Sequence, residues 1–106
     1  MKNDRILSLL SIAEKGGNVK SGEFLTEESV KRRKSMLVIV AGDASDNTKK
    51  RFENMCARYK VPCITYADRE SLGHAIGKEF RASLSVVEKG LAEKIMELAG
   101  DSEVKQ

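Results

Sequence analysis

The chain has 106 residues, of which 41% are hydrophobic and 33% are charged. This composition fits one globular domain with its own core and excludes a disordered chain. The net charge of +3 permits an anionic partner without requiring one. Two cysteines and one histidine are too few for a disulfide framework or a zinc site. Cys56 and Cys63 are therefore predicted to be reduced core thiols, and no metal or other cofactor is expected.

The first five residues are polar and mixed in charge, and the apolar stretch after them is amphipathic and interrupted by serines. Neither a signal peptide nor a membrane-spanning segment is expected here. We therefore expect a cytoplasmic protein, monomeric by default. A single domain is predicted over residues 1–99, followed by a flexible polar tail over residues 100–106.

The first half of the chain predicts two helices and then a strand. Asn3 or Asp4 can cap a helix that Gly16-Gly17 ends. A short extended piece over 18–21 leads to a second helix over about 23–33. Residues 36–41 are a continuous apolar run rich in β-branched side chains, which is typical of a central strand covered on both faces.

The second half predicts further alternation. Ser45 or Asp46 can cap a third helix that runs to residue 59 and buries Phe52, Met55, Cys56 and Tyr59. Strands are expected over 63–66 and 84–87, a short helix capped by Asp68 lies between them, and an amphipathic helix over about 91–98 follows. Strands that alternate with helices predict an α/β domain with helices on both faces of a small sheet.

Catalysis has little support in the sequence. His74 is the only histidine, and it lies in a short glycine-punctuated helix rather than beside a nucleophile and an orienting acid. Gly73 to Lys78 superficially suggests a phosphate-binding loop, but three residues rather than four separate its glycines, and Glu79 follows the lysine. The paired acids stand at expected helix caps or beside lysines. We therefore expect a protein that is not an enzyme.

Basic residues are more informative. Residues 31–34 form one cluster before the central strand, and residues 49–51 form another in the first turns of the third helix, where cations oppose the helix dipole. A solvated surface and a phosphate-binding surface both remain open for such clusters. Gly22 precedes a helix start, whose free backbone N–H groups suit phosphate oxygens or base edges.

Five segments stand in one order and spacing: VKSGE at 19–23, MLVIVAGDAS at 36–45, NTKK at 47–50, YKVP at 59–62 and LGHAIGKE at 72–79. Together they resemble the L7Ae/L30e family of ribosomal proteins, and most closely its bacterial YlxQ-type branch. The resemblance implies a three-layer α/β/α sandwich with a small mixed four-stranded sheet. It also implies a non-catalytic, ribosomal or ribosome-associated protein that binds kink-turn RNA, a sharply bent duplex with G·A pairs and a flipped-out nucleotide.

The resemblance places RNA-binding residues on separate segments of the chain. The start of the second helix would face the G·A pairs, and the turn after the central strand, the fourth helix and the loop before the last strand would enclose the extruded nucleotide. The implied residues are Lys20, Ser21, Gly22, Glu23, Phe24, Lys31, Arg32, Ser45, Lys49, Arg69, Phe80, Arg81, Ala82 and Ser83.

Three positions depart from the family pattern. Many members carry Asn-Glu in the first turn of the second helix and a lysine about one turn later, where this chain has Phe24, Leu25 and Glu28. Lys31 and Arg32 are hypothesised to compensate for Glu28 from the next turn. The departures leave a second hypothesis open, a protein-interaction module on the same fold with weakened or lost RNA binding.

Overall fold

The computed structural model of the chain describes residues 4–104, and side chains over residues 4–100. This part of the chain contains five helices and four strands. In chain order they are α1 (Arg5–Lys15), β1 (Val19–Ser21), α2 (Glu23–Lys31), β2 (Leu37–Val40), α3 (Asp46–Tyr59), β3 (Cys63–Thr65), α4 (Arg69–Ala75), β4 (Ser83–Val86) and α5 (Lys89–Val104).

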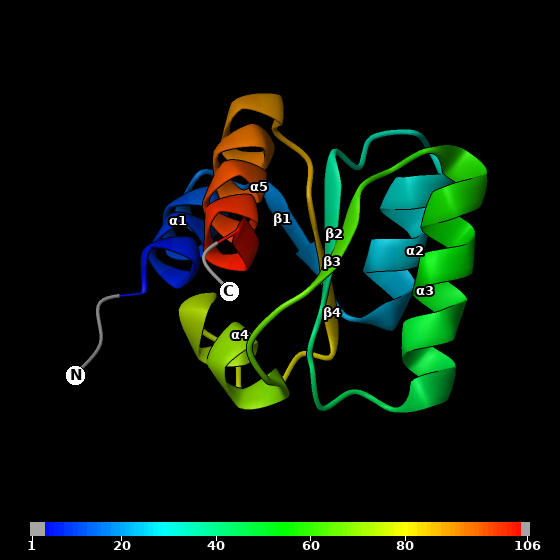
Figure 1. Cartoon of the computed structure of the whole chain (residues 1–106), viewed down its shortest axis with the longest axis horizontal. Helices are drawn as coiled ribbons and strands as arrows, with labels where there is room; N and C mark the ends of the chain where they lie inside the picture. Colours follow the sequence, from blue (N-terminus) through cyan, green and yellow to red (C-terminus); the bar gives the residue numbers. More distant parts are fainter. Residues whose placement is uncertain (1–3, 105–106) are drawn as a thin grey trace.

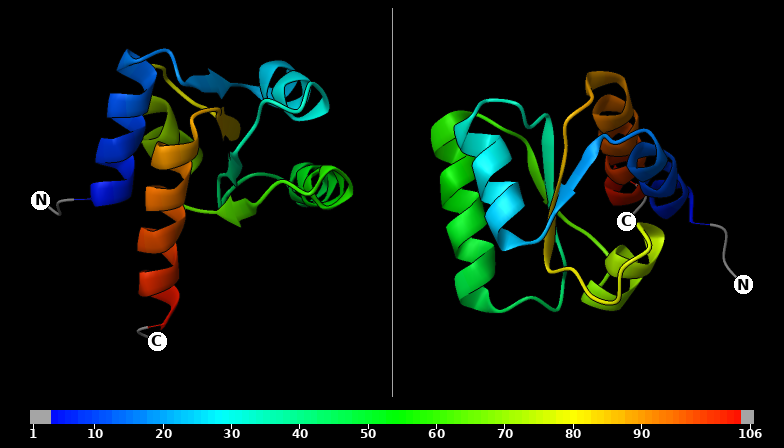
Figure 2. Two further views of the ribbon diagram at one scale, coloured as in Figure 1. Left: turned by 90° about the horizontal axis from the view of Figure 1, so that it is seen from above. Right: turned by 180° about the vertical axis from the view of Figure 1, so that it is seen from behind.

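The elements form three layers. The strands make one sheet in the order β1-β4-β2-β3, with β2 parallel to β3 and all other neighbours antiparallel. Helices α2 and α3 cover one face of this sheet, and α1, α4 and α5 cover the other (Figures 1 and 2). This arrangement confirms the predicted α/β/α sandwich with a small mixed four-stranded sheet.

The central strand has the burial that its sequence predicts. All four residues of β2 are buried, because helices pack on both faces of the sheet and strands flank both edges of β2. The core on either side of the strand is aliphatic apart from one ring. Its largest fully buried side chains include Phe52, Leu10, Leu37, Ile39, Leu84 and Ile95. Cys56 is buried, Cys63 is half-buried, and both are free thiols.

The predicted helix caps form. The side chains of Asp4, Ser45 and Asp68 accept hydrogen bonds from backbone N–H groups three residues later, which satisfies donors at the starts of α1, α3 and α4. Helix α2 differs, because Gly22 precedes it with φ at 91° and no side-chain cap is present there. That φ lies in a region that favours glycine.

Several boundaries differ from the prediction. Helix α2 ends at Lys31, because Arg33 takes φ of 61° and turns the chain toward β2. Ser83 belongs to β4 rather than to the loop before it. Met55 and Tyr59 are only half-buried, because α3 covers an edge of the sheet.

The C-terminal part of the chain is more helical than predicted. Helix α5 runs to Val104, beyond the predicted end near residue 98. Residues 105 and 106 of the predicted tail lie outside the described residues, as do residues 1–3 with the alternative cap Asn3. The division into a domain and a flexible tail stays a prediction. Within the described helices, none combines the length and apolar character needed to cross a bilayer.

Candidate functional site

Arg81 connects three of the segments that the sequence singled out. Its Nε donates to Oγ of Ser21 at 3.1 Å, and its Nη1 donates to the carbonyl of Phe80 at 2.7 Å. Its backbone N–H donates to the carbonyl of Arg69 at 3.0 Å. The end of β1, the loop before β4 and the start of α4 therefore meet at one half-buried guanidinium.

The turn after β2 meets these three segments through Asp43, and the surface that the four segments form is called the Arg81 edge below. The Asp43 carboxylate accepts a hydrogen bond from the backbone N–H of Arg69 at 2.9 Å and lies 3.5 Å from the Arg69 Nε. The backbone N–H of Ala41 also donates to the carbonyl of Ala82 at 2.8 Å. These contacts hold the Arg69 guanidinium beside the turn and keep that turn next to the loop before β4.

The start of α2 lies at this edge as well. The backbone N–H of Gly22 donates to the carbonyl of Ser83 at 3.0 Å, which fixes the helix start against β4. No side chain in the described part of the chain caps α2. The first backbone N–H groups of this helix therefore stay available to an outside acceptor such as a phosphate oxygen.

Two aromatic rings flank these donors. Phe24, in the first turn of α2, is 73% exposed, and Phe80, in the loop before β4, is 57% exposed. Both rings are therefore open to contact with another molecule. Planar bases stack on such rings.

Ser45 and Lys49 extend the edge at the start of α3. Ser45 is exposed and uses its hydroxyl to cap the helix, and the backbone N–H of Lys49 donates to its carbonyl at 3.0 Å. The half-buried Lys49 therefore lies one turn from Ser45, which follows the Asp43 turn.

Lys31 and Arg32 do not join this edge. They lie at the opposite end of α2, about 12 Å from Glu23 at the usual rise of 1.5 Å per residue. Each forms an ion pair with a glutamate one turn back, Lys31 with Glu27 at 2.7 Å and Arg32 with Glu28 at 3.5 Å. Lys20 is exposed on β1 and lies beside α2 rather than at the Arg81 contacts.

Arg51 has a role that the sequence did not reveal. From α3 it reaches across to α2, where Nη1 lies 2.7 Å from Glu23 Oε2 and Nη2 donates to Glu27 Oε1. The hydrogen bond from Lys31, together with the charges of Arg51 and Lys31, lowers the pKa of Glu27. Both carboxylates are thereby neutralised locally. Of the cluster at 49–51, only the two lysines remain candidates for phosphate contacts.

Asp43 was also missed as a site residue. The position of Asp43 was a signal in the sequence, because an acid in the turn after a central strand lies where the chain passes to the neighbouring helical layer and can contact it. Its partner, however, lies 26 residues away, and nothing local identifies that pairing.

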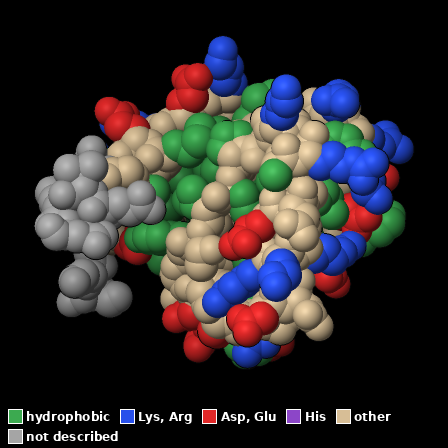
Figure 3. Space-filling model, turned by 45° about the vertical axis from the view of Figure 1, so that its right-hand side comes forward, with side chains coloured by type: hydrophobic (Ala, Val, Ile, Leu, Met, Phe, Trp, Pro, Cys, Tyr) green, Lys and Arg blue, Asp and Glu red, His purple; other side chains and the backbone are tan. Residues whose placement is uncertain are grey.

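The charge on the surface is mixed rather than concentrated in one block. Lys and Arg side chains lie at the top, along the right and in the lower middle of the face in Figure 3, with acidic and apolar groups among them. With a net charge of only +3, discrimination between ligands must therefore come from the local arrangement of donors, cations and rings.

Comparisons with known proteins agree with this arrangement. The model of the "Ribosomal protein L7Ae/L30e/S12e/Gadd45 family" matches residues 4–96. The RNA-binding protein YlxQ of Bacillus subtilis is 38% identical over 90 residues, which cover 85% of this chain and 90% of the relative. The protein of the same name from Enterococcus faecium is 34% identical over 94 residues, covering 89% and 90%.

Solved structures show the same fold. A protein with unknown function from Bacillus halodurans superposes with a TM-score of 0.88 at 32% identity, covering 91% of this chain and 97% of that one. The Giardia lamblia 15.5kD RNA binding protein superposes with a TM-score of 0.77 at 23% identity, covering 98% and 92%, a likeness of fold alone. This chain belongs to the L7Ae/L30e/S12e/Gadd45 family of ribosomal proteins and is similar to its bacterial YlxQ members, as its sequence motifs predicted.

Proposed function

We propose that this chain is a binder of structured RNA of the kink-turn type, and that it grips the RNA at the edge around Arg81. The relatives named RNA-binding protein YlxQ support the RNA part of this proposal. The observation that carries the site is the set of hydrogen bonds from Arg81 to Ser21, Phe80 and Arg69. They tie three separate segments into one surface.

Each part of this surface suits one part of a bent RNA. The uncapped N–H groups of α2 and the cations at Arg69 and Lys49 suit phosphates, which position the RNA without reading its sequence. The rings of Phe24 and Phe80 suit unstacked bases, which a kink exposes and a regular A-form duplex hides. Half-buried Ala82 provides a small side chain where an extruded nucleotide would enter. The predicted contact of the Ser83 side chain is wrong, because this residue is buried in β4.

The chain is not an enzyme. The family to which it belongs and the relatives named as RNA-binding proteins confirm that prediction. The proposed site accordingly contains donors, cations and rings rather than a nucleophile beside a base. An association with the ribosome, a cytoplasmic location and a monomeric state remain part of the proposal.

A gel-shift titration tests the proposal with two RNAs of equal length, a kink-turn and a straight duplex. We expect the kink-turn to bind at least about tenfold more tightly and the affinity to fall with added salt, as counterion release requires. Equal binding of both RNAs would contradict the kink-turn specificity.

A pair of exposed apolar residues supplies a matched test of the surface. Phe80→Ala should weaken kink-turn binding about tenfold or more, because one stacked base contributes about 1–3 kcal/mol. Ile12 is also 57% exposed but lies on α1, which carries none of the residues that the Arg81 contacts connect. Ile12→Ala should leave the affinity unchanged.

A protein-interaction module is the second candidate function. Phe24 and Leu25, 73% and 43% exposed, stand where many family members carry Asn-Glu, and Glu28 stands where they carry lysine. Exposed apolar groups beside an acid also suit a protein partner. If the wild-type chain binds no RNA and Glu28→Lys creates binding, this second function is favoured.

A further inference from the structure

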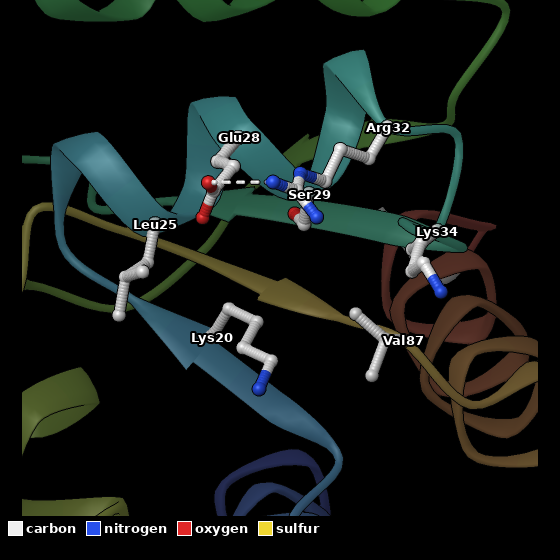
Figure 4. Close-up of a pocket in the computed structure, with 7 residues that line it drawn as sticks. All are labelled: Lys20, Leu25, Glu28, Ser29, Arg32, Lys34 and Val87. Atoms are coloured by element: carbon white, nitrogen blue, oxygen red, sulfur yellow. Dashed lines mark ion pairs between the residues drawn. The ribbon is translucent and has the colours of Figure 1, made fainter.

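A hollow of about 270 Å³ lies between α2 and the edge strand β1, away from the Arg81 contacts (Figure 4). Three cations, one carboxylate, one hydroxyl and two apolar side chains line it, namely Lys20, Arg32, Lys34, Glu28, Ser29, Leu25 and Val87. Pockets that bind drug-sized ligands measure roughly 300–1,000 Å³, so this smaller hollow suits a group about the size of one nucleotide base.

The hollow follows from the sheet topology. β1 is an edge strand, so no further strand lies beside Lys20. Lys20 pairs in register with Ser85, whose hydroxyl lies 2.7 Å from that of Ser35 beneath the C-terminal end of α2. Lys20 therefore projects on the α2 side of the sheet and forms one wall, with α2 forming the other.

Glu28 is the group that a plain phosphate site does not explain. An acid among three cations weakens phosphate binding. Arg32 lies 3.5 Å from its Oε2, longer than the 2.7–3.2 Å of a good hydrogen bond, so the carboxylate keeps most of its capacity to accept. The second carboxylate oxygen points toward the space between α2 and β1 (Figure 4).

We propose that this hollow binds one unpaired guanine nucleotide of the RNA, an inference that rests on the proposed RNA-binding function. Glu28 accepts hydrogen bonds from the Watson–Crick edge of the base, while Leu25 and Val87 contact its ring. Lys20 and Lys34 bind the adjoining phosphates. Arg32 holds the carboxylate of Glu28 in position from the far side.

Guanine is the base that matches a carboxylate. Its N1–H and N2 amino groups are adjacent donors, which the two oxygens of one carboxylate can accept together. Adenine and cytosine place an acceptor nitrogen beside their amino group, and uracil places its single N–H between two carbonyl oxygens. The nucleotide must be unpaired, because pairing occupies the same edge.

Two trinucleotides of equal charge, UGU and UAU, test the inference by NMR titration of the methyl groups of Leu25 and Val87. Because both ligands offer the same phosphates, their difference in affinity reports the base alone. We expect UGU to bind about tenfold more tightly, the discrimination that one good bidentate contact provides. Glu28→Gln should reduce the ratio to about twofold.

The control is Glu93→Gln, which removes an exposed carboxylate from α5 on the opposite face of the sheet. It should leave the tenfold ratio unchanged. Lys34→Ala should weaken UGU and UAU by the same factor, because it removes a phosphate contact.

Equal affinities for UGU and UAU, or methyl shifts confined to other parts of the protein, would overturn the guanine site. A kink-turn gel shift on the same samples separates the two proposals. If kink-turn RNA binds but UGU is not preferred, the guanine site is wrong and the proposed function stands. If UGU is preferred but no kink-turn RNA binds, the guanine site stands and the kink-turn function is wrong.

Discussion

Gly73 allows the loop before β4 to lie directly on α4, and its substitution tests how the proposed site is built. A Cβ at this position would lie 2.7 Å from the backbone C and O of Glu79 and 2.9 Å from the N of Phe80. Ordinary contact begins near 3.4 Å, so Gly73→Ala forces the loop to withdraw by about 0.7 Å. That loop carries Phe80 and Arg81.

The expected loss of stability combines two opposing effects. Overpacking costs about 1–3 kcal/mol, and the upper part of that range applies because the obstructing atoms are backbone. Replacing glycine within a helix returns about 1 kcal/mol. The net loss is about 2 kcal/mol, and with an m-value of about 1.5 kcal/mol/M the urea midpoint should fall by about 1.3 M.

Gly100 supplies the matched control, because a Cβ there meets open space on α5. Gly100→Ala should raise the urea midpoint by up to about 0.7 M. Gly73→Ala should also weaken kink-turn binding, since its loop moves, whereas Gly100→Ala should not. If Gly73→Ala stabilises the protein as Gly100→Ala does, the close approach of loop and helix is wrong.

Three further perturbations test individual contacts. The pKa of Tyr66 is raised to about 12, mainly because the phenol is partly buried. The 2.8 Å hydrogen bond to Asp4 and the negative charge of that carboxylate raise it further. The folded value exceeds the ordinary 10, so this stabilisation is complete below about pH 10 and is lost as the pH rises toward 12. In urea titrations, the stability advantage of the wild type over Tyr66→Phe should therefore shrink across that range, and a constant difference would argue against the Asp4 contact. Arg51→Gln leaves Glu23 without its cation, while Glu27 keeps Lys31, and should weaken RNA binding several-fold more than Lys50→Gln in a gel shift at low salt, whereas equal effects would mean that Arg51 contacts phosphate instead. Gly22→Ala places a side chain at φ of 91° and should cost about 1–2 kcal/mol in urea denaturation, and an unchanged midpoint would contradict the backbone conformation of the α2 start.

The fold could be predicted largely from local patterns. The apolar run at 36–41 marked the central strand, and the oxygen-bearing side chains of Asp4, Ser45 and Asp68 marked three helix starts, because a cap acts on donors only three residues away. The end of α2 was predicted two residues late. Nothing in the sequence near Arg33 indicates its positive φ of 61°.

The candidate site was less accessible from the sequence. Motif order brought Gly22, Arg69 and Arg81 into one hypothesis, and the structure places them at one edge. The contacts of Asp43 with Arg69 and of Arg51 with Glu23 join residues 26 and 28 positions apart. Only the folded chain shows that these charges satisfy one another.

Lys31 and Arg32 were predicted as site residues, but the structure places them away from the Arg81 contacts. Their charge suggested an RNA contact, but their own i,i+4 glutamate partners and their place at the far end of α2 separate them from the Arg81 edge. Arg32 instead lines the hollow beside β1. A basic run therefore indicates a candidate surface without indicating which ligand group it meets.

The most direct test of the account is an amide NMR map of the protein titrated with kink-turn RNA. We expect the largest shifts at residues 21–24, 43–45, 69 and 80–83, which the contacts of Arg81, Asp43 and Gly22 bring together. Shifts concentrated on α1 and α5, with Gly22 and Arg81 unmoved, would contradict it.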